Sequence, residues 1–549
     1  MPDAARRSPS RRAWIAGCVL VVLAGVLVRA WIHTRSPITP SIDGGYYAIQ
    51  PRSLIAHGKL DYPDMPLKFA LDAGLARCLQ ATTAMTLDEA CMRASQVTDC
   101  VGPALIAVPV FLIAASVGGG TALWSACAIA LLLVAGGPAL RMVGDFQKNS
   151  LALVWYAAAL QQALRALAAI DSGRTPWPRV SSTGVLVALA TLTHAGTGAA
   201  AAFNVALIAA VAVIVRPDLR RAMLGWRGAM ALVAGIGSVG AAFLVIRWLD
   251  PVRAARIVSA VARLASDDGG SGARRGGPTF MPLAYGPFAA AALASALSWW
   301  RVVRTAAARA WAERAVCCGC AIACLVFTLP AIDGDAMGRL ALVAMVPGAV
   351  AVLLSLASGP TGARGAWPAW LVMAAVPLTA PPAIAFASRP SIDPDSLDEL
   401  RAMHALVPEH RGALLVARHG LEFWANYAID VNTRQSGIPA DAFTRYERVL
   451  VLVERQPSGP MAVDASRDGR RERFGPPPGR NLRDGPPGMG PPPGDGPGRG
   501  PPGGPRGMRP PAGSGLIHSS EHYRLFEVPR DAATGEGGDD APTDDEPRP

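Results

Sequence analysis

A carboxylate and two phenols lie together directly after the first long apolar run of the chain. Asp43 is followed by two glycines and then by Tyr46 and Tyr47. A carboxylate close to a membrane surface can accept a proton from a substrate, and partial desolvation raises its pKa toward the pH at which such a base works best. Asp43 is therefore the candidate general base. The alternative is that Asp43 accepts backbone N–H bonds at the start of the next helix.

A second polar turn separates two apolar runs between residues 141 and 149. Within this turn, Lys148 is placed to contact a phosphate at the level of lipid headgroups. Asp145 is a candidate to assist an acceptor or a metal. The alternative for Lys148 is that its charged end reaches out of the apolar layer to the water at the interface. The sequence leaves both interpretations of Lys148 open.

Three further polar residues are candidates to bind substrate. His194 follows an apolar run, and ionisable residues at membrane depth are costly and often functional. A single histidine can also be an ordinary packing residue. Asp61 and Asp64 lie in a proline-containing loop, where they either bind substrate hydroxyls or only shape the loop.

Long apolar segments must position these residues. The 549 residues are 51% hydrophobic and 17% charged, with a mean hydropathy of +0.28, whereas a soluble protein has about 25% charged residues. The apolar blocks are roughly 17–22 residues long, enough to cross a ~30 Å hydrocarbon layer. We expect a polytopic α-helical membrane protein with about eleven transmembrane helices. The predicted spans are 13–32, 101–118, 121–140, 150–168, 181–195, 197–215, 228–247, 285–300, 315–331, 339–358 and 367–387.

The net charge of +11 reflects topology rather than binding to nucleic acid. Arginines gather in short loops, which marks the cytoplasmic side. The first span lacks a good cleavage signature, so we expect it to remain in the protein. In the plasma (inner) membrane, the N-terminus is then cytoplasmic and the C-terminal region extracytoplasmic. One disulfide in the first outer loop would suit an oxidising compartment, among Cys78, Cys91 and Cys100.

The composition changes after residue 390, which predicts a domain boundary. We expect a transmembrane domain over 1–390, with the acidic segment in its outer loop 33–100. Short β-rich runs and a helical pattern predict a small extracytoplasmic α/β domain over 391–530, with strands near 413–417, 449–453 and 523–528. The Gly/Pro-rich insertion 456–515 and the acidic tail 531–549 have too few apolar residues to offset the entropy of ordering. We predict that both are disordered.

The segment after the first span resembles that of the GT-C superfamily of membrane glycosyltransferases, most closely the protein-mannosyltransferase and aminoarabinose-transferase branch. In that family an acidic motif opens the first outer loop, and a Tyr-containing helix, a glycine and a Pro-Pro-Leu-like segment follow. The matching residues are Asp43, Tyr46, Tyr47, Gly58, Pro66 and Leu67. Two positions differ: Gly44 lies where many relatives have a second acid, and Met65 replaces the first proline.

The resemblance implies a transferase that moves a sugar, with inversion, from a polyprenyl-phosphate donor to an extracytoplasmic acceptor (a lipid, a glycan or a protein). It implies Asp43 as the catalytic residue. It also implies that an arginine such as Arg339 neutralises the lipid phosphate, which suits a planar guanidinium; interfacial anchoring is the alternative. The substrate-binding candidates are Tyr46, Tyr47, Asp61, Asp64, Asp145, Lys148, His194 and Arg339.

No cofactor is assigned, because the differences at Gly44 and Met65 leave a divalent metal open. The expected partners are a polyprenyl-phosphate-linked sugar, an extracytoplasmic acceptor and membrane lipid, and not nucleic acid. Two alternatives remain, namely a transporter or lipid flippase and a catalytically degenerate relative. Transporters tend to have internal repeats, and the two halves of this sequence show none.

Overall fold

The computed structural model describes residues 9–118, 121–216, 311–328, 334–357, 363–408, 410–435, 437–455 and 510–531, together with the isolated positions 244 and 247. Four predicted segments therefore lie wholly or mostly outside the described residues: the spans 228–247 and 285–300, the Gly/Pro-rich insertion and the acidic tail. The chain divides into two compact units. The helical unit comprises Met1–Arg35 and Gln50–Ser388, and the sheet unit comprises Ser36–Ile49 and Arg389–Pro549.

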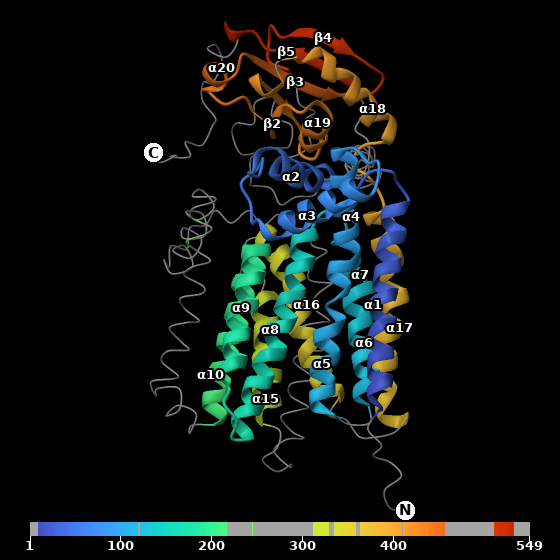
Figure 1. Ribbon diagram of the computed structural model, residues 1–549, viewed down its shortest axis with the longest axis vertical. Helices are drawn as coiled ribbons and strands as arrows, with labels where there is room; N and C mark the ends of the chain where they lie inside the picture. Colours follow the sequence, from blue (N-terminus) through green and yellow to red (C-terminus); the bar gives the residue numbers. More distant parts are fainter. Residues whose placement is uncertain are drawn as a thin grey trace, which may run out of the picture. The chain divides into compact units, whose positions relative to one another are not determined.

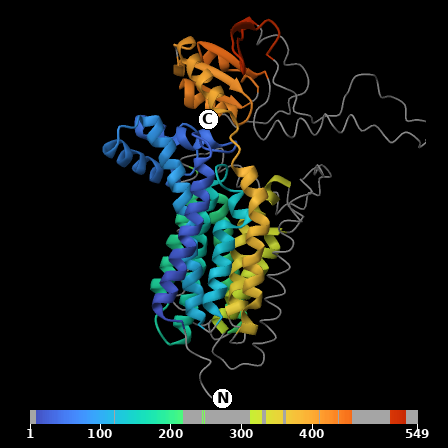
Figure 2. The ribbon, with the colours of Figure 1, turned by 90° about the vertical axis from the view of Figure 1, so that its right-hand side faces the viewer.

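Long helices of the helical unit run alongside one another (Figure 1), and a view turned by 90° shows the same arrangement (Figure 2). Helix α8 packs against α9, and α10 packs against α15. The described helices are α1 (Arg11–Thr34), α2 (Gly44–His57, which begins in the sheet unit), α3 (Leu67–Thr82), α4 (Leu87–Ala104), α5 (Ala107–Val117), α6 (Ala122–Ala135), α7 (Gly137–Leu140), α8 (Gln147–Asp171), α9 (Trp177–Thr193), α10 (Ala195–Val215), α15 (Trp311–Thr328), α16 (Gly334–Ala357) and α17 (Ala363–Ala387).

Eight helical segments among the described residues are long and apolar enough to cross a membrane. They are Arg11–Thr34, Leu87–Val117, Ala122–Leu140, Gln147–Asp171, Ala195–Val215, Trp311–Thr328, Arg339–Ala357 and Ala369–Ala387. The predicted class, a helical protein with many apolar spans and a small sheet domain, is confirmed. The predicted number of about eleven transmembrane helices is not confirmed. The predicted span 181–195 corresponds to α9, which has 17 residues and is not among the eight segments.

Helix ends and close helix contacts in this unit follow from local sequence. Thr86 and Glu89 form a capping box that starts α4, which satisfies backbone N–H groups that have no partner within the helix. Small residues let the apolar helices approach each other. A Cβ atom at Gly25 would lie 2.8 Å from the Cβ of Val134, and one at Gly319 would lie 2.6 Å from Ile208.

All nine cysteines are free thiols. Cys91 and Cys100 are buried within α4, and Cys78 is exposed on α3. The disulfide that the sequence left open among these three residues is therefore not formed in this structure.

The sheet unit contains a five-stranded sheet in the order β2-β1-β3-β5-β4. Strand β1 is parallel to β2 and β3, whereas β5 is antiparallel to β3 and β4. The elements are α18 (Pro394–Ala402), η1 (Met403–Leu406), η2 (His410–Gly412), β1 (Ala413–Ala417), α19 (Leu421–Ile429), β2 (Asn432–Gln435), α20 (Ala442–Arg445), β3 (Arg448–Glu454), β4 (Gly515–Ser519) and β5 (Tyr523–Glu527). The three predicted strands correspond to β1, β3 and β5, while β2 and β4 were not predicted.

The segment with Asp43 belongs to the sheet unit by its contacts. The backbone N–H of Ser41 donates to the carbonyl of Arg389 at 2.9 Å, and Ser41 forms a parallel bridge with Pro390. Two segments that are far apart in the sequence are therefore hydrogen-bonded to each other just before α2 begins.

Candidate functional site

Asp43 directly precedes α2, at a place where the backbone packs too tightly for most side chains. A Cβ atom at Gly44 would lie 2.4 Å from the carbonyl oxygen of Thr39, and one at Gly45 would lie 3.0 Å from the backbone of Phe423. Only glycine fits such distances without a shift of the backbone. The second acid that many relatives have at the position of Gly44 could not be placed here.

The Asp43 side chain is 30% exposed, and its Oδ1 lies 3.8 Å from Nε2 of His419. Nδ1 of His419 is in turn 3.0 Å from Oε1 of the buried Glu422. The sequence analysis missed both residues of this pair. A histidine and a glutamate three residues apart at the start of a short helix are a weak signal of function. This spacing does not indicate that either residue lies near Asp43.

Tyr46 and Tyr47 lie in an aromatic cluster of the sheet unit. Their rings meet edge to face at 5.3 Å, and the Tyr46 ring lies 5.1 Å from that of Phe423. Both tyrosines are buried, Tyr47 at 1% exposure and Tyr46 at 9%. The structure therefore gives them a packing role, and their contact with substrate stays a prediction.

In the helical unit, two predicted site residues come together. The Lys148 ammonium forms an ion pair with Oδ2 of Asp64, and it lies 5.8 Å from the centre of the Phe69 ring. The Asp64 carboxylate is buried and also accepts the backbone N–H of Met65 at 2.7 Å. Because Asp64 fixes the ammonium, Lys148 is held at the start of α8 rather than extended freely. Asp145, three residues before Lys148, is 8% exposed.

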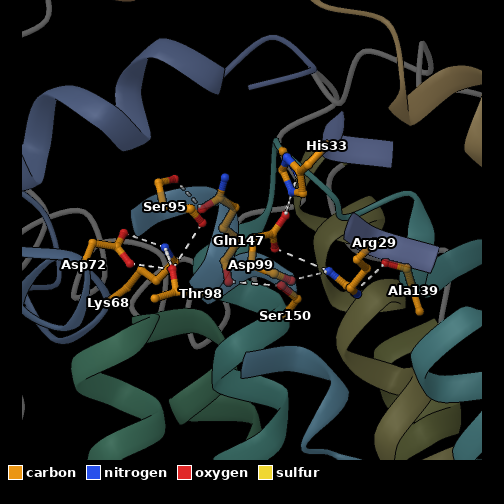
Figure 3. A network of polar contacts seen from close by, with 11 residues as sticks. Arg29, His33, Lys68, Asp72, Ser95, Thr98, Asp99, Ala139, Gln147 and Ser150 are labelled. Carbon is orange, nitrogen blue, oxygen red and sulfur yellow. Dashed lines mark hydrogen bonds and ion pairs between the residues drawn. The ribbon is translucent and has the colours of Figure 1, made fainter. Parts of the chain in front are cut away.

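A buried polar network lies beside this turn (Figure 3). Asp99 accepts from Nη1 of Arg29 at 3.3 Å, from the backbone N–H of Gly144 at 3.2 Å, and pairs with Nε2 of His33 at 2.9 Å. Arg29 also donates from Nη1 to the backbone carbonyl of Asp99 at 3.2 Å and from Nη2 to the carbonyl of Ala139 at 3.0 Å. Arg29 and Asp99 thereby fix the backbone on both sides of residues 140–143, directly before Asp145.

A second part of the network centres on Asp72 of α3. Lys68 donates to Asp72 Oδ2 and Thr98 donates to Asp72 Oδ1, both at 2.5 Å. Burial raises the pKa of the Asp72 carboxyl, against the opposing effect of the Lys68 charge. No sequence pattern predicts a role for Lys68 or Asp72, because both charged residues lie within a helix.

Three further predicted site residues lie in other surroundings of the helical unit. His194 caps α10, since its Nδ1 accepts the backbone N–H of Thr197 at 3.1 Å. Gln50 Oε1 holds the loop of Asp61 by accepting its backbone N–H at 2.9 Å. Arg339 is exposed on α16. Contact of His194, Asp61 or Arg339 with substrate stays a prediction.

One group among the described residues has the side chains and spacing to hold a metal ion. Its ligand atoms, from Glu399, Glu521 and His522 in the sheet unit, lie within 4.8 Å of one another. Carboxylate and imidazole groups suit a divalent transition metal. Two of these groups already bind each other, because Oε1 of Glu399 lies 2.8 Å from Nδ1 of His522. None of the predicted site residues belongs to this group.

Comparison with known proteins identifies the fold. No family model and no curated protein sequence matches the chain. The apo structure of the oligosaccharyltransferase of Archaeoglobus fulgidus is similar at a TM-score of 0.54 and 14% identity, over 80% of this chain and 69% of that one. The same enzyme in complex with an inhibitory peptide and a dolichol-phosphate gives 0.53 and 15%, over 79% and 69%. A weaker similarity, at a TM-score of 0.49 and 10% identity over 95% and 99%, is to ArnT from Cupriavidus metallidurans bound to undecaprenyl phosphate.

At such identities the similarity to the oligosaccharyltransferase establishes the fold. The predicted fold, a bundle of apolar helices with a small sheet domain, is confirmed at that level, and the resemblance to the GT-C superfamily stays a prediction. Together with the eight apolar helices, this fold indicates a multi-pass membrane protein.

Proposed function

We propose that this protein is a membrane glycosyltransferase that moves a sugar from a polyprenyl-phosphate donor to an extracytoplasmic acceptor with inversion. The fold supports the class, since the solved structures that share it include an oligosaccharyltransferase in complex with a dolichol-phosphate. The observation that carries the proposal is the exposure of Asp43. Residues 44–50 are all buried, yet the Asp43 carboxylate is 30% exposed and open to a substrate.

In the proposed reaction, Asp43 takes the proton of the acceptor while the acceptor attacks the anomeric carbon of the sugar. The bond from that carbon to the phosphate oxygen breaks, and its electron pair leaves with the phosphate. Because attack and departure occur on opposite faces of the carbon, the configuration inverts. A base positioned in this way typically contributes ~10²–10⁴ in rate.

The departing phosphate needs cations, and we assign this role to Lys148 and Arg339. Asp64 holds the Lys148 ammonium through the ion pair described above, so a phosphate would share that cation or displace the carboxylate from it. Charge-assisted hydrogen bonds of this kind are about twice as strong as neutral ones. The other proposed substrate contacts are Tyr46, Tyr47, Asp61, Asp64, Asp145 and His194.

The orientation proposed from the arginine-rich loops places the sheet unit outside the cell membrane, together with the Asp43 segment. A lipid-linked donor suits that side. If a divalent ion is required, Glu399, Glu521 and His522 are the described residues that could hold one, and chelation would test the requirement.

A transfer assay with a panel of radiolabelled polyprenyl-phosphate sugars tests the proposal. Purified protein should consume at least one donor and release the free polyprenyl phosphate in amounts equal to the glycosylated acceptor. A folded preparation that consumes none of them would contradict the proposal. Transport of an intact lipid-linked sugar across a vesicle bilayer, without cleavage, would instead favour the flippase alternative.

A further inference from the structure

His419 lies between two carboxylates of different environment. Its Nδ1 is 3.0 Å from Oε1 of Glu422, which is the distance of a hydrogen bond. Its Nε2 is 3.8 Å from Oδ1 of Asp43, which is the distance of an ion pair. The imidazole thus connects the proposed base to a second acid in the first turn of α19.

Glu422 fixes which nitrogen of His419 faces Asp43. The Glu422 side chain is 3% exposed, and its Oε2 has no hydrogen-bond partner among the described residues. An ionised carboxylate only accepts hydrogen bonds, so with Glu422 in that form the short contact places the proton on Nδ1 of the ring. In the neutral ring the lone pair is then on Nε2, toward Asp43.

The surrounding backbone holds the ring in this position. His419 precedes Gly420, which has a φ of +88° and at which a Cβ atom would lie 2.8 Å from Ile42. This close approach brings the residue next to Asp43 against the start of α19. On its other side, the His419 ring meets Phe423 edge to face at 5.7 Å.

One cation lies next to His419 in the chain, and it is engaged elsewhere. Arg418 donates from Nη1 to the carbonyl oxygen of His419 at 2.9 Å, and its Nε and Nη2 are paired with Glu454. Among the described residues, Asp43 and Glu422 are carboxylates in contact with the imidazole, and the Arg418–Glu454 pair adjoins it through the backbone of His419.

We propose that His419 receives the proton that Asp43 takes from the acceptor, and that Glu422 stabilises the resulting imidazolium. This inference rests on the proposed function. The bond from the anomeric carbon to the acceptor forms, the bond to the phosphate breaks, and the acceptor proton passes to Asp43 and then to Nε2 of His419. The ring is 43% exposed, so it can release the proton to water. His419 is thus a positioning residue that acts through Asp43 and returns it to the carboxylate form.

The pH dependence of transfer tests this role. If His419 accepts the proton, the wild-type rate should rise with pH, because only a neutral ring can accept another proton. His419→Gln should lose this rise and should be slower at high pH, by less than the ~10²–10⁴ expected for the base itself, with an unchanged melting temperature. His404→Gln, at an exposed histidine of the same unit, should keep the wild-type profile. An unchanged profile in His419→Gln would overturn the inference.

A second measurement needs no donor. Diethyl pyrocarbonate modifies neutral histidine, and mass spectrometry of the full chain gives the modification of His419 as a function of pH. The midpoint should move to lower pH in Asp43→Asn and in Glu422→Gln, because either change removes a carboxylate that stabilises the imidazolium. It should not move in Asp441→Asn, whose carboxylate pairs with Arg445 instead. Equal midpoints in Asp43→Asn and the wild type would overturn the inference.

The two proposals fail in different ways. A folded wild-type protein that consumes no donor would overturn the proposed function, and full transfer in Asp43→Asn would overturn the role of Asp43 as the base. Loss of transfer in Asp43→Asn, together with an unchanged pH profile in His419→Gln, would leave the proposed function and overturn only the role of His419.

Discussion

Arg29 and Asp99 form an ion pair of 3.3 Å in which both side chains are almost completely buried, at 1% and 0% exposure. They belong to α1 and α4, and Asp99 also accepts the backbone N–H of Gly144 at 3.2 Å. The first helix is thereby tied to the turn that precedes Asp145. A buried pair of this kind is favourable only while both charges and their hydrogen bonds are present.

Asp99→Asn should therefore destabilise the protein by about 3–5 kcal/mol, because it leaves the buried Arg29 guanidinium without a counter-charge. Thermal unfolding in detergent gives the comparison. Asp88→Asn is the matched control on the same helix: Asp88 pairs with Arg52 at 3.4 Å but is 46% exposed, and such pairs contribute about 0–1 kcal/mol. Equal melting temperatures for the two variants would show that the Arg29–Asp99 pair does not support the fold.

Gly44→Ala should lower the melting temperature, since the new Cβ atom would lie 2.4 Å from the Thr39 carbonyl oxygen. Gly74→Ala, in α3, is the control, because nothing lies within 4 Å of a Cβ atom there. Alanine is favoured over glycine inside a helix by about 1 kcal/mol, so this variant should be as stable as the wild type or more so. A Gly44→Ala protein of wild-type stability would mean that the start of α2 is not packed as described.

The sequence predicts best what depends on local composition. Strands β1 and β3 follow from continuous apolar runs, which are typical of buried strands, and the first span follows from an apolar run long enough to cross a membrane. Strand β2 is the polar segment Asn432–Gln435, and it forms only because its backbone pairs with β1. No local pattern predicts such an edge strand.

The candidate site was predictable only in part, for a similar reason. Asp43, Asp64 and Lys148 stand out because they lie in polar segments between long apolar runs, on the side predicted to be opposite to the arginine-rich loops. The contact of Asp43 with His419 depends instead on tertiary packing, which brings together residues that are far apart in the sequence. A single sequence contains no signal for that pairing.

Lys148→Met should raise the KM for the donor by about 10- to 100-fold, the equivalent of a charge-assisted hydrogen bond of roughly 1.5–3 kcal/mol. The variant also leaves the buried Asp64 carboxylate without its cation. The double variant Asp64→Asn/Lys148→Met removes that penalty and should regain stability but not donor affinity. If the double variant regains both, Lys148 has only a structural role.

The Glu399–His522 pair should make the stability of the sheet unit depend on pH. Burial opposes ionisation of Glu399, but hydrogen bonds from Ser520 and His522 outweigh it and lower the pKa below the usual 4.5. The hydrogen bond to Glu399 raises the pKa of His522 above the usual 6.5. The Glu399 contribution is lost as the pH falls through its lowered pKa, and the His522 contribution is lost as the pH rises through its raised pKa.

The pair therefore contributes its full stabilisation only between pH 4.5 and pH 6.5, which are the usual pKa values of Glu and His side chains. Melting temperatures of the full chain across pH 3–9 measure this window. His522→Gln should flatten the loss above pH 6.5, whereas His518→Gln, on the neighbouring strand β4, should not. Identical curves for the wild type and His522→Gln would contradict the assignment.

The central claim, that Asp43 is the general base, is tested most directly by the initial rate of sugar transfer in Asp43→Asn, with a donor that the wild type consumes. Asparagine keeps the size of the side chain and part of its hydrogen bonding but cannot accept the proton. The account predicts a rate lower by ~10²–10⁴ at unchanged protein level and melting temperature. A wild-type rate in Asp43→Asn would contradict it.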